Sequence, residues 1–515
     1  MHRRRFLQAS LSTGLLITLP STVLAGAPAP APQSWQSKFA AAAEEQPWLN
    51  GYRSVGAESY AASASLRGKI PSELHGTLYR NGPALHEIGS FRWHHWFDGD
   101  GMLQAYRISK EGIHHQARMI ETPKYLAEKA AGKPLYSAFG TAVEDALGVS
   151  GPDTLNPANI SVLPHHGKLY ALWEAGSPVE VDAQTLDTVG FHAFSEETEG
   201  VPFSAHPRIE PDGNLWNFGY SSSASLLILW HIDPSGRVKR TGVVPVAPMS
   251  MPHDFVVTAQ HLIIMIPPLW HEPEEGVAQS FLASHRWHGD QPTRVLVIDK
   301  NDFSKHQTYE LPAQWVFHYG NAWEDRAGVI HFDAARADAP TAMTQTFTEV
   351  MRGIRAPAAP TRHTIYRIDT RQGKISEAPM LGSRDDLETE FPAIDPRLTG
   401  RRNERLFMLS SSTSQPAPNG GLNAVSAYRA DKDSLDTYTY PISQLPEEHL
   451  FVPKPNSAPE SAGWVLGSAY DFTRDKTLLN IFNADHLADG PICTATLPYG
   501  LPLGLHGKFV GDLRG

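Results

Sequence analysis

Short runs of β-branched and aromatic residues recur from about residue 66 onward, and they constrain the fold of this chain more than any other feature. Gly, Pro, Asp and Asn punctuate them, and few long helical patterns lie between them. This spacing is typical of many short antiparallel strands, so the sequence predicts an all-β fold. Loosely repeated hairpin turns favour a β-propeller, although no crisp repeat supports it. The runs are Lys168–Glu174, Leu215–Tyr220, Leu226–Ile232, His261–Ile266, Arg294–Ile298, Val329–Asp333, Thr364–Ile368, Leu406–Leu409, Val465–Tyr470 and Thr477–Phe482.

The N-terminus has the order of an export signal. Residues 3–7 read Arg-Arg-Arg-Phe-Leu, and an interrupted apolar stretch and small residues follow up to Ala27. The arginine pair resembles a twin-arginine signal, with an ordinary Sec signal as the alternative. The apolar stretch is too short to span a bilayer. We therefore expect residues 1–27 to be a signal peptide and the mature protein to be periplasmic, exported by the twin-arginine route.

An extended linker and one helix are expected after the signal. Ala and Pro alternate from residue 27 to 33, and helix-forming residues follow over 35–46. Residues 28–48 are therefore assigned to a linker and an N-terminal helix.

Charge and cysteine content exclude several classes of function. The net charge of −11 argues against a nucleic-acid partner, because phosphate binding needs a clustered basic surface. The single cysteine, Cys493, excludes an intramolecular disulfide framework and any cysteine-rich metal site. A metal site would have to use carboxylates and some of the 24 histidines.

Four histidines have similar local surroundings, each beside a turn or a strand end. They are too far apart for a local metal motif, but the inner strands of a radial fold would converge on one axis. Periodicity alone does not select these four from the 24, and each taken singly is more often a core or surface residue. They are His206, His253, His318 and His506.

Several motifs, in order from about residue 49 to the C-terminus, resemble those of the carotenoid cleavage oxygenases. The resemblance implies one domain over residues 49–515, a seven-bladed β-propeller with a few helices and loops capping its top face. It also implies one non-haem Fe(II) per chain, held at the axis by the four histidines named above. The motifs are Leu-Tyr-Arg-Asn-Gly-Pro at 78–83, His-Trp-Phe-Asp-Gly-Asp-Gly-Met at 95–102, the four histidine contexts, and Glu-Phe-Pro at 390–392.

The resemblance further implies that three glutamates orient the histidines. Imidazole suits Fe(II), and a ligating ring usually donates its second N–H to a carboxylate. The three are Glu174, Glu390 and Glu448, and Glu447 competes with Glu448 because it adjoins it. A surface carboxylate is the alternative for each.

Four residues are candidates for the wall of a substrate tunnel. Ile160 stands where many members of the family carry Thr, and Trp173 stands where stilbene-cleaving members carry Lys. Losing that cation favours a polyene over a phenol. Phe317 and Phe391 each adjoin a proposed ligand or carboxylate, but neighbouring residues on a strand point to opposite faces, so a core role is the alternative.

Two further segments have open interpretations. Asp98 and Asp100 are expected to satisfy turn N–H groups, with a calcium loop as the alternative. Residues 267–287 mix Pro, Trp, Phe and Leu, and they would form either an apolar mouth that takes substrate from a membrane or a cover over the propeller.

The sequence thus predicts an Fe(II) dioxygenase that cleaves a conjugated C=C bond of a carotenoid or apocarotenoid into two carbonyl products. Its partners would be a hydrophobic small molecule and O2, with peripheral membrane contact and no nucleic acid. The alternatives are cleavage of a stilbene or other phenylpropanoid, a non-catalytic periplasmic binding propeller, and a calcium-dependent hydrolase or lactonase. The last is disfavoured because calcium prefers oxygen ligands.

Overall fold

The computed structural model describes residues 34–355, 359–382, 387–412 and 415–511, and the expected signal peptide lies outside these residues. Most of the predicted runs form strands with closely similar bounds. Two of them, Leu226–Ile232 and His261–Ile266, coincide with strands β14 and β17. The expected helix over 35–46 is α1 (Trp35–Glu45), whose first turn is capped by the side chain of Ser34.

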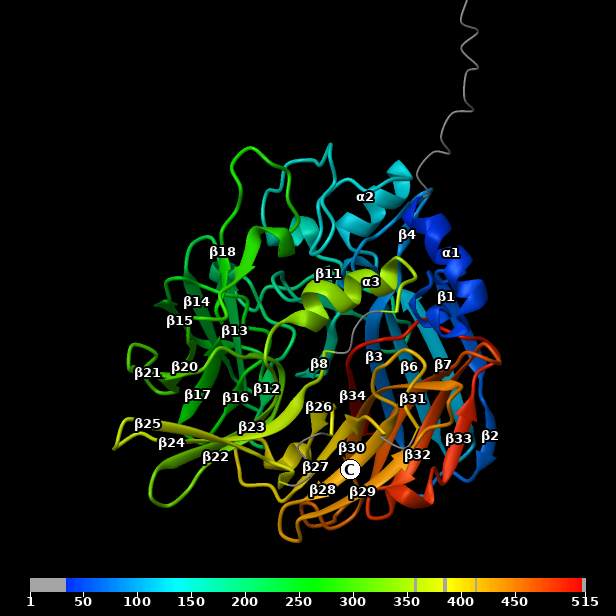
Figure 1. Ribbon diagram of the computed structural model, residues 1–515. Coiled ribbons are helices and arrows are strands. Elements are labelled where there is room, and N and C mark those ends of the chain that lie inside the picture. The colour runs from blue at the N-terminus through cyan, green and yellow to red at the C-terminus, as the bar shows by residue number, and fades with distance from the viewer. Residues whose placement is uncertain (1–33, 356–358, 383–386, 413–414, 512–515) are drawn as a thin grey trace, which may run out of the picture. The chain divides into compact units, whose positions relative to one another are not determined.

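The described residues contain seven antiparallel sheets of four or five strands, which are the blades of a propeller (Figure 1). The prediction of an all-β, seven-bladed propeller is therefore confirmed. We number the blades in chain order and give their strands from the inner edge outward. Blade 1 contains β34 (Gly507–Gly511), β3 (Gly76–Leu85), β6 (Asp100–Ser109), β7 (Gly112–Met119) and β1 (Ser59–Ser63). Blade 2 contains β8 (Ser161–His165), β9 (Lys168–Leu172), β10 (Val179–Val181) and β11 (Thr188–Phe191). Blade 3 contains β12 (Arg208–Ile209), β13 (Leu215–Ser221), β14 (Leu226–Ile232) and β15 (Val238–Pro245).

The remaining blades follow the same plan. Blade 4 contains β16 (Val256–Val257), β17 (His261–Ile266), β20 (Thr293–Asp299) and β21 (His306–Leu311). Blade 5 contains β22 (Trp315–Glu324), β23 (Val329–Ala337), β24 (Arg362–Asp369) and β25 (Lys374–Pro379). Blade 6 contains β26 (Thr389–Ala393), β27 (Arg405–Ser410), β28 (Ala424–Arg429) and β29 (Ser434–Thr439). Blade 7 contains β30 (Gln444–Pro453), β31 (Gly463–Asp471), β32 (Lys476–Asn483), β33 (Cys493–Thr496) and β2 (Ser65–Gly68).

Segments from the two ends of the chain close the ring. The late strand β34 pairs with β3 in blade 1, and the early strand β2 pairs with β33 in blade 7. First and last blades are therefore each completed by a segment from the opposite end of the sequence, which leaves no open seam between them.

Inner strands of neighbouring blades contact one another around the axis. Strand β16 contacts β22, which contacts β26, and the series continues through β30 and β34 to β8. Any side chain at the axial end of these strands is therefore close to its counterparts from other blades, whatever their separation in sequence.

Burial falls from the middle of each blade to its outer edge. All of β31 is buried, whereas β2 is exposed throughout and β25 almost throughout. The second strand of a blade lies between two neighbouring blades, so both of its faces are covered. Apolar clusters fill these spaces; one joins Ile263 and Val295 of blade 4 to Ile330 and Phe332 of blade 5.

Helices and short hairpins gather at the upper side of the propeller in Figure 1. They include α1, α2 (Pro123–Ala131), the π-type turn η6 (Ala342–Thr346), α3 (Phe347–Met351) and the 3-10 turns η1 (Pro47–Tyr52) and η2 (Trp96–Asp98). The segment 267–287 contributes strands β18 (Leu269–His271) and β19 (His285–Trp287), which pair with each other, and the 3-10 turn η5 (Leu282–Ser284). Small elements complete the chain: β4 (Glu87–Ile88), β5 (Phe91–Arg92), η3 (Pro152–Leu155), η4 (Glu196–Thr198), η8 (Pro396–Leu398) and η9 (Leu487–Asp489). Among the described residues, no helix has the length and apolar character needed to cross a membrane.

Candidate metal centre

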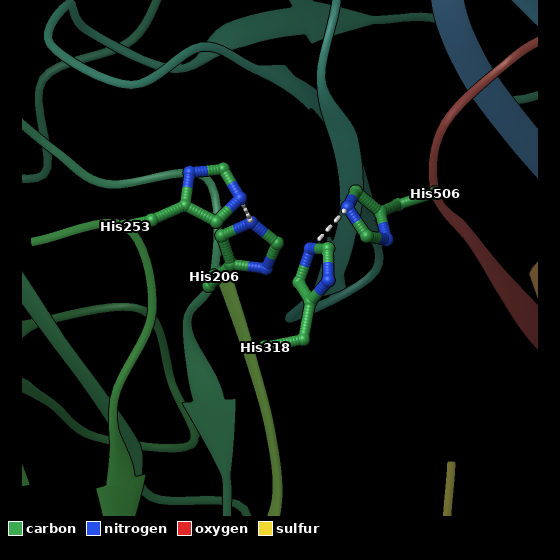
Figure 2. A group of neighbouring side chains, drawn as sticks. All are labelled: His206, His253, His318 and His506. Atoms are coloured by element: carbon green, nitrogen blue, oxygen red, sulfur yellow. Dashed lines mark hydrogen bonds between the residues drawn. The ribbon is translucent and has the colours of Figure 1, made fainter. Parts of the chain in front are cut away.

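The four predicted histidines lie at the axial ends of four inner strands. His206 and His253 precede β12 and β16, His318 lies within β22, and His506 immediately precedes β34. One nitrogen from each ring lies within 4.8 Å of those of the other three. Figure 2 shows the rings turned toward one another from separate segments of chain. The structure thus brings the four residues together from blades 1, 3, 4 and 5.

The ring nitrogens farthest from the backbone converge in two close pairs. Nε2 of His206 lies 3.0 Å from Nε2 of His253, and Nε2 of His318 lies 3.1 Å from Nε2 of His506. All four rings therefore turn their Nε2 edge inward.

Glutamate carboxylates lie behind two of the rings as hydrogen-bond acceptors. Nδ1 of His318 lies 2.6 Å from Oε2 of Glu390, and Nδ1 of His506 lies 2.8 Å from Oε1 of Glu448. A neutral imidazole that donates its Nδ1–H to a carboxylate keeps a lone pair on Nε2. These two rings are thus held in the tautomer that presents a ligand atom to the centre.

The third carboxylate lies behind His253, and the fourth ring has none. Nδ1 of His253 lies 2.7 Å from Oε1 of Glu174, at ion-pair distance but off the line of a hydrogen bond. Within the described residues, no carboxylate lies at ion-pair distance from His206. Burial, together with the neighbouring histidines and Arg208, lowers the pKa of His206 well below its usual value.

The seven side chains come from all seven blades of the described residues. Blades 1, 3, 4 and 5 each supply one histidine, and blades 2, 6 and 7 each supply one of the predicted glutamates. Glu174 follows the second strand of its blade, β9, whereas the other two glutamates lie on inner strands. In the same blade, Ile160 immediately precedes the inner strand β8.

β-Bulges explain how neighbouring residues on one strand both reach the axis. The pairing register of β22 shifts between Val316 and Tyr319, around Phe317 and His318. Similar shifts occur in β26 after Glu390 and in β30 just before His449. A bulge interrupts the alternation of side chains and re-aims them, which removes the geometric objection to adjacent residues sharing one cavity.

The two adjacent glutamates of β30 have different partners. Glu448 contacts Nδ1 of His506, whereas a carboxylate oxygen of Glu447 accepts a hydrogen bond from the backbone N–H of Gly504. The buried guanidinium of Arg80 lies 3.7 Å from Glu447 and 3.9 Å from Glu448. Burial opposes ionisation of Glu448, but His506 and Arg80 lower its pKa to about 2.

An ion pair connects three of the histidine-bearing segments. The Arg208 guanidinium donates to Oδ2 of Asp254 at 2.6 Å and to the carbonyl of Phe255 at 2.8 Å. The same Oδ2 accepts from the backbone N–H of Tyr319 at 3.0 Å. Arg208 is two residues from His206, and Asp254 and Tyr319 directly follow His253 and His318, so this network fixes the separation of blades 3, 4 and 5 at the centre.

The donor set fits a cation with a preference for imidazole. Nε2 of His318 and Nε2 of His506 lie 3.1 Å apart. If both rings are neutral and donate Nδ1–H to a carboxylate, two lone pairs face each other and repel unless a positive centre, a proton or a metal ion, lies between them. Burial lowers the pKa of His506 to about 4, so a proton is poorly held on that ring. For His318, the carboxylate of Glu390 outweighs burial and raises the pKa. Four neutral nitrogen donors suit Fe(II), and would also accept Zn(II).

An apolar cavity of about 230 Å³ adjoins the histidines. His253, His318 and His506 form part of its wall. Of the four predicted tunnel residues, Ile160, Phe317 and Phe391 line it. The other aromatic residues in its wall are Trp48, Tyr52, Trp96, Phe97 and Phe347, which come mainly from the capping elements.

The fourth predicted tunnel residue lies elsewhere. Trp173 is not among the residues that line the cavity; it packs, half-buried, against the apolar cluster that contains Leu172 and Phe203. No residue of the segment 267–287 lines the cavity either, and Phe281 and Trp287 of that segment pack against the core.

A second, polar cavity of about 90 Å³ lies against His206, His318 and His506. It is lined by Arg208, Asp254 and Lys508. His318, His506 and Phe391 belong to the walls of both cavities. The histidine centre is therefore situated between an apolar compartment and a polar one.

The two aspartates of the 95–102 motif have structural partners. Asp98 accepts hydrogen bonds from the Gly140 N–H and the Thr141 hydroxyl, and Asp100 forms a buried ion pair with Lys124. In the part of the chain that the structure describes, the one group of side chains arranged to hold a metal is the histidine centre.

Several cavity residues were missed from the sequence. Trp48, Tyr52 and Trp96 lie in 3-10 turns and Phe347 begins α3, so no strand pattern marks these residues. Glu388 was also missed, although it stands two residues before Glu390, and alternate residues of an extended segment lie on the same side.

Comparisons with known proteins agree with this geometry. A family model described as "Retinal pigment epithelial membrane protein" matches residues 52–511. The chain is 29% identical over 488 residues to an apocarotenoid-15,15'-oxygenase of Synechocystis, covering 90% of this chain and 96% of that protein. It is 27% identical over 465 residues to lignostilbene-alpha,beta-dioxygenase isozyme III of Sphingomonas paucimobilis, covering 86% and 92%. Among solved structures, cobalt-substituted Synechocystis ACO superposes with a TM-score of 0.80 at 27% identity, covering 91% of this chain and 99% of the other.

Proposed function

Because the chain belongs to the retinal pigment epithelial membrane protein family, whose members include carotenoid cleavage oxygenases, we propose that it cleaves a conjugated C=C bond of an apocarotenoid with O2. The products would be two carbonyl compounds. The observation that carries the proposal is the convergence of four imidazole nitrogens, within 4.8 Å of one another, at the wall of an apolar cavity.

We propose further that His206, His253, His318 and His506 hold one Fe(II) per chain. Iron bound there would supply the redox chemistry that activates O2. Glu390 and Glu448 fix the tautomer of their rings through Nδ1. Glu174 lies in the corresponding place behind His253.

The other side chains of the cavity position the substrate. Aromatic side chains of the capping elements exclude water from the cavity and hold a flat, conjugated substrate against the histidine wall. Ile160 and Phe317 add apolar surface there, so the depth to which a polyene enters would determine which bond is cleaved. No general base is needed for this reaction class.

Support for an apocarotenoid comes from the relative named for that activity and from the apolar, aromatic wall of the cavity. A stilbene or phenylpropanoid is the second candidate. Its support is the cavity volume of about 230 Å³, which is below the range of about 300–1,000 Å³ common for drug-sized ligands and favours a short substrate.

We also propose that the protein is exported to the periplasm and contacts a membrane peripherally. Basic residues at 3–5 ahead of an apolar stretch support export. Exposed apolar side chains, among them Leu147, Val149 and Val277, support membrane contact.

One experiment tests the proposal against a non-catalytic binding propeller. Purified protein is loaded with Fe(II) without oxygen, its iron is quantified, and it is then exposed to air with a β-apocarotenal or a hydroxystilbene. We expect about one iron per chain and paired aldehyde products identified by mass. A protein that binds no iron, or binds it and cleaves neither alkene, would contradict the proposal.

A further inference from the structure

The wall of the apolar cavity contains a carboxyl group that the proposed reaction does not use. Glu388 immediately precedes β26, two residues before Glu390. Both glutamates line the cavity, whereas Thr389 between them is fully buried and does not. Alternate residues of an extended segment share one side, and the backbones of these two residues are about 7 Å apart along the strand. The carboxylate of Glu390 accepts a hydrogen bond from His318. Glu388 lies two residues before Glu390 on the same wall and makes no hydrogen bond or ion pair with the four histidines.

The carboxyl group of Glu388 has no partner among the residues that the structure describes. Its backbone N–H donates to the hydroxyl of Ser411, and its carbonyl accepts from the N–H of the same residue. Within the described ranges, however, no hydrogen bond or ion pair reaches its side-chain oxygens. Burial, with the charge of Glu390 nearby, raises the pKa of Glu388 to about 7. A half-buried carboxyl group left without a partner is unfavourable, and most such groups in native proteins are paired.

Neighbouring polar groups do not supply the missing partner. The hydroxyl of Thr361 donates to the carbonyl of Thr389. The side chain of Asn419 interacts with the hydroxyl of Tyr52. Apolar side chains of the same wall include Leu409 and Leu422. Since no described residue supplies a partner for Glu388, a molecule inside the cavity would supply it.

We propose that Glu388 determines substrate specificity by hydrogen-bonding a neutral hydroxyl group of the substrate. This proposal rests on the proposed function, and it narrows the substrate class to conjugated alkenes that carry an alcohol or an un-ionised phenol. A hydroxyl group suits the site because it costs far less to desolvate than an ammonium group. The charge of Glu390, together with that of Glu388 when it is ionised, disfavours substrates that end in a carboxylate or a phenolate.

Equilibrium binding tests this assignment without turnover. The iron-loaded protein is kept free of oxygen and titrated, by quenching of its tryptophan fluorescence, with trans-4-hydroxystilbene and with trans-stilbene. The same comparison is made with 3-hydroxy-β-apo-8′-carotenal and β-apo-8′-carotenal. We expect the wild type to bind the hydroxylated member of at least one pair about tenfold or more tightly than its partner.

Two variants and a control isolate the side chain. Glu388→Leu should reduce the ratio of the two dissociation constants to near one, and Glu388→Gln, which keeps a hydrogen-bonding amide, should retain part of it. Glu310→Gln alters an exposed carboxylate on the outer strand β21 and should keep the wild-type ratio. The proposal is overturned if Glu388→Leu and Glu388→Gln both keep that ratio, or if the wild type does not discriminate within either pair.

The role of Glu388 and the proposed oxygenase activity can be refuted independently of each other. When air is admitted, cleavage of both members of a pair without discrimination in binding would support the oxygenase and refute the role of Glu388. A ratio that depends on Glu388, without cleavage of any alkene, would support the hydroxyl site and refute the oxygenase.

Discussion

Nε2 of His318 lies 3.1 Å from Nε2 of His506, although the two residues are 188 positions apart in the sequence. Each ring has its other nitrogen on a carboxylate, Glu390 in one case and Glu448 in the other. With both Nδ1–H groups engaged, neutral rings point two lone pairs at each other across this short distance. This arrangement is favourable once a cation lies between the rings, and it is the physical basis of the predictions on metal binding.

Removing one imidazole should abolish metal binding. We expect His318→Ala to retain less than about a tenth of the wild-type iron after desalting, because three donors and an unpaired Glu390 carboxylate remain. Atomic emission measures the iron, and Fe(II) should raise the melting temperature of the wild type but not of the variant. The control is His114→Ala, on the exposed face of β7. Wild-type iron content in His318→Ala would remove this residue from the centre.

Substitutions at the two adjacent glutamates of β30 should have different effects. Glu448→Gln weakens the acceptor of the His506 ring, so we expect a 10- to 100-fold loss of iron affinity, together with a lower melting temperature because the ionised carboxylate is stabilised by its partners. Glu447→Gln weakens the contact that holds the Gly504 backbone and should mainly lower the melting temperature. Competition with a chelator measures affinity, and thermal unfolding measures stability. The reverse pattern would mean that Glu447 is the residue that orients the ring.

The side chain of Phe391 should keep the two cavities apart. Its ring stacks on His318, with centroids 5.1 Å apart, and it belongs to both cavity walls. Phe391→Ala should join the cavities and admit water, lowering kcat/KM by about tenfold or more and speeding removal of iron by a chelator. Phe391→Leu fills most of the same volume and serves as the matched control. If the alanine variant loses iron no faster than the leucine variant, the ring is not a barrier.

Breaking the ion pair between blades should cost stability as well as metal affinity. Asp254→Ala leaves the Arg208 guanidinium without its carboxylate and the N–H of Tyr319 without its acceptor. We expect a loss of about 3 kcal/mol in the free energy of unfolding, measured in urea, because one partner of a largely buried pair is removed. Asp254→Asn keeps an acceptor oxygen and should lose less. Equal stability of the alanine variant and the wild type would show that the network carries no net stabilisation.

The strands that could be predicted from the sequence are those with long apolar runs. Leu226–Ile232 is one such run, because residues inside a blade are covered on both sides. The two-residue strands β12 and β16 have no run to detect, yet they follow two of the histidines. The number of blades came from the resemblance, since no crisp repeat marks them.

The candidate site was less accessible to sequence reasoning alone. No local spacing unites the four histidines, because their proximity is created by the ring of inner strands. Glu447 and Glu448 are chemically identical neighbours, and only the bulge in β30 distinguishes their directions. Trp173 adjoins Glu174 but is not part of the cavity wall. The sequence shows no bulge positions in advance, so it could not tell which neighbours of a glutamate face the cavity. Glu388 could have been predicted from Glu390, because alternate residues of an extended segment lie on the same side.

The closing strand β34 also sets an order of events during synthesis. His506 comes directly before it, so a nascent chain still short of this point offers at most three of the four imidazoles. The fourth donor is therefore in place only after the segment that contains His506 has been synthesised. On this geometry, a metal held by all four imidazoles would bind only after strands of all seven blades have been synthesised.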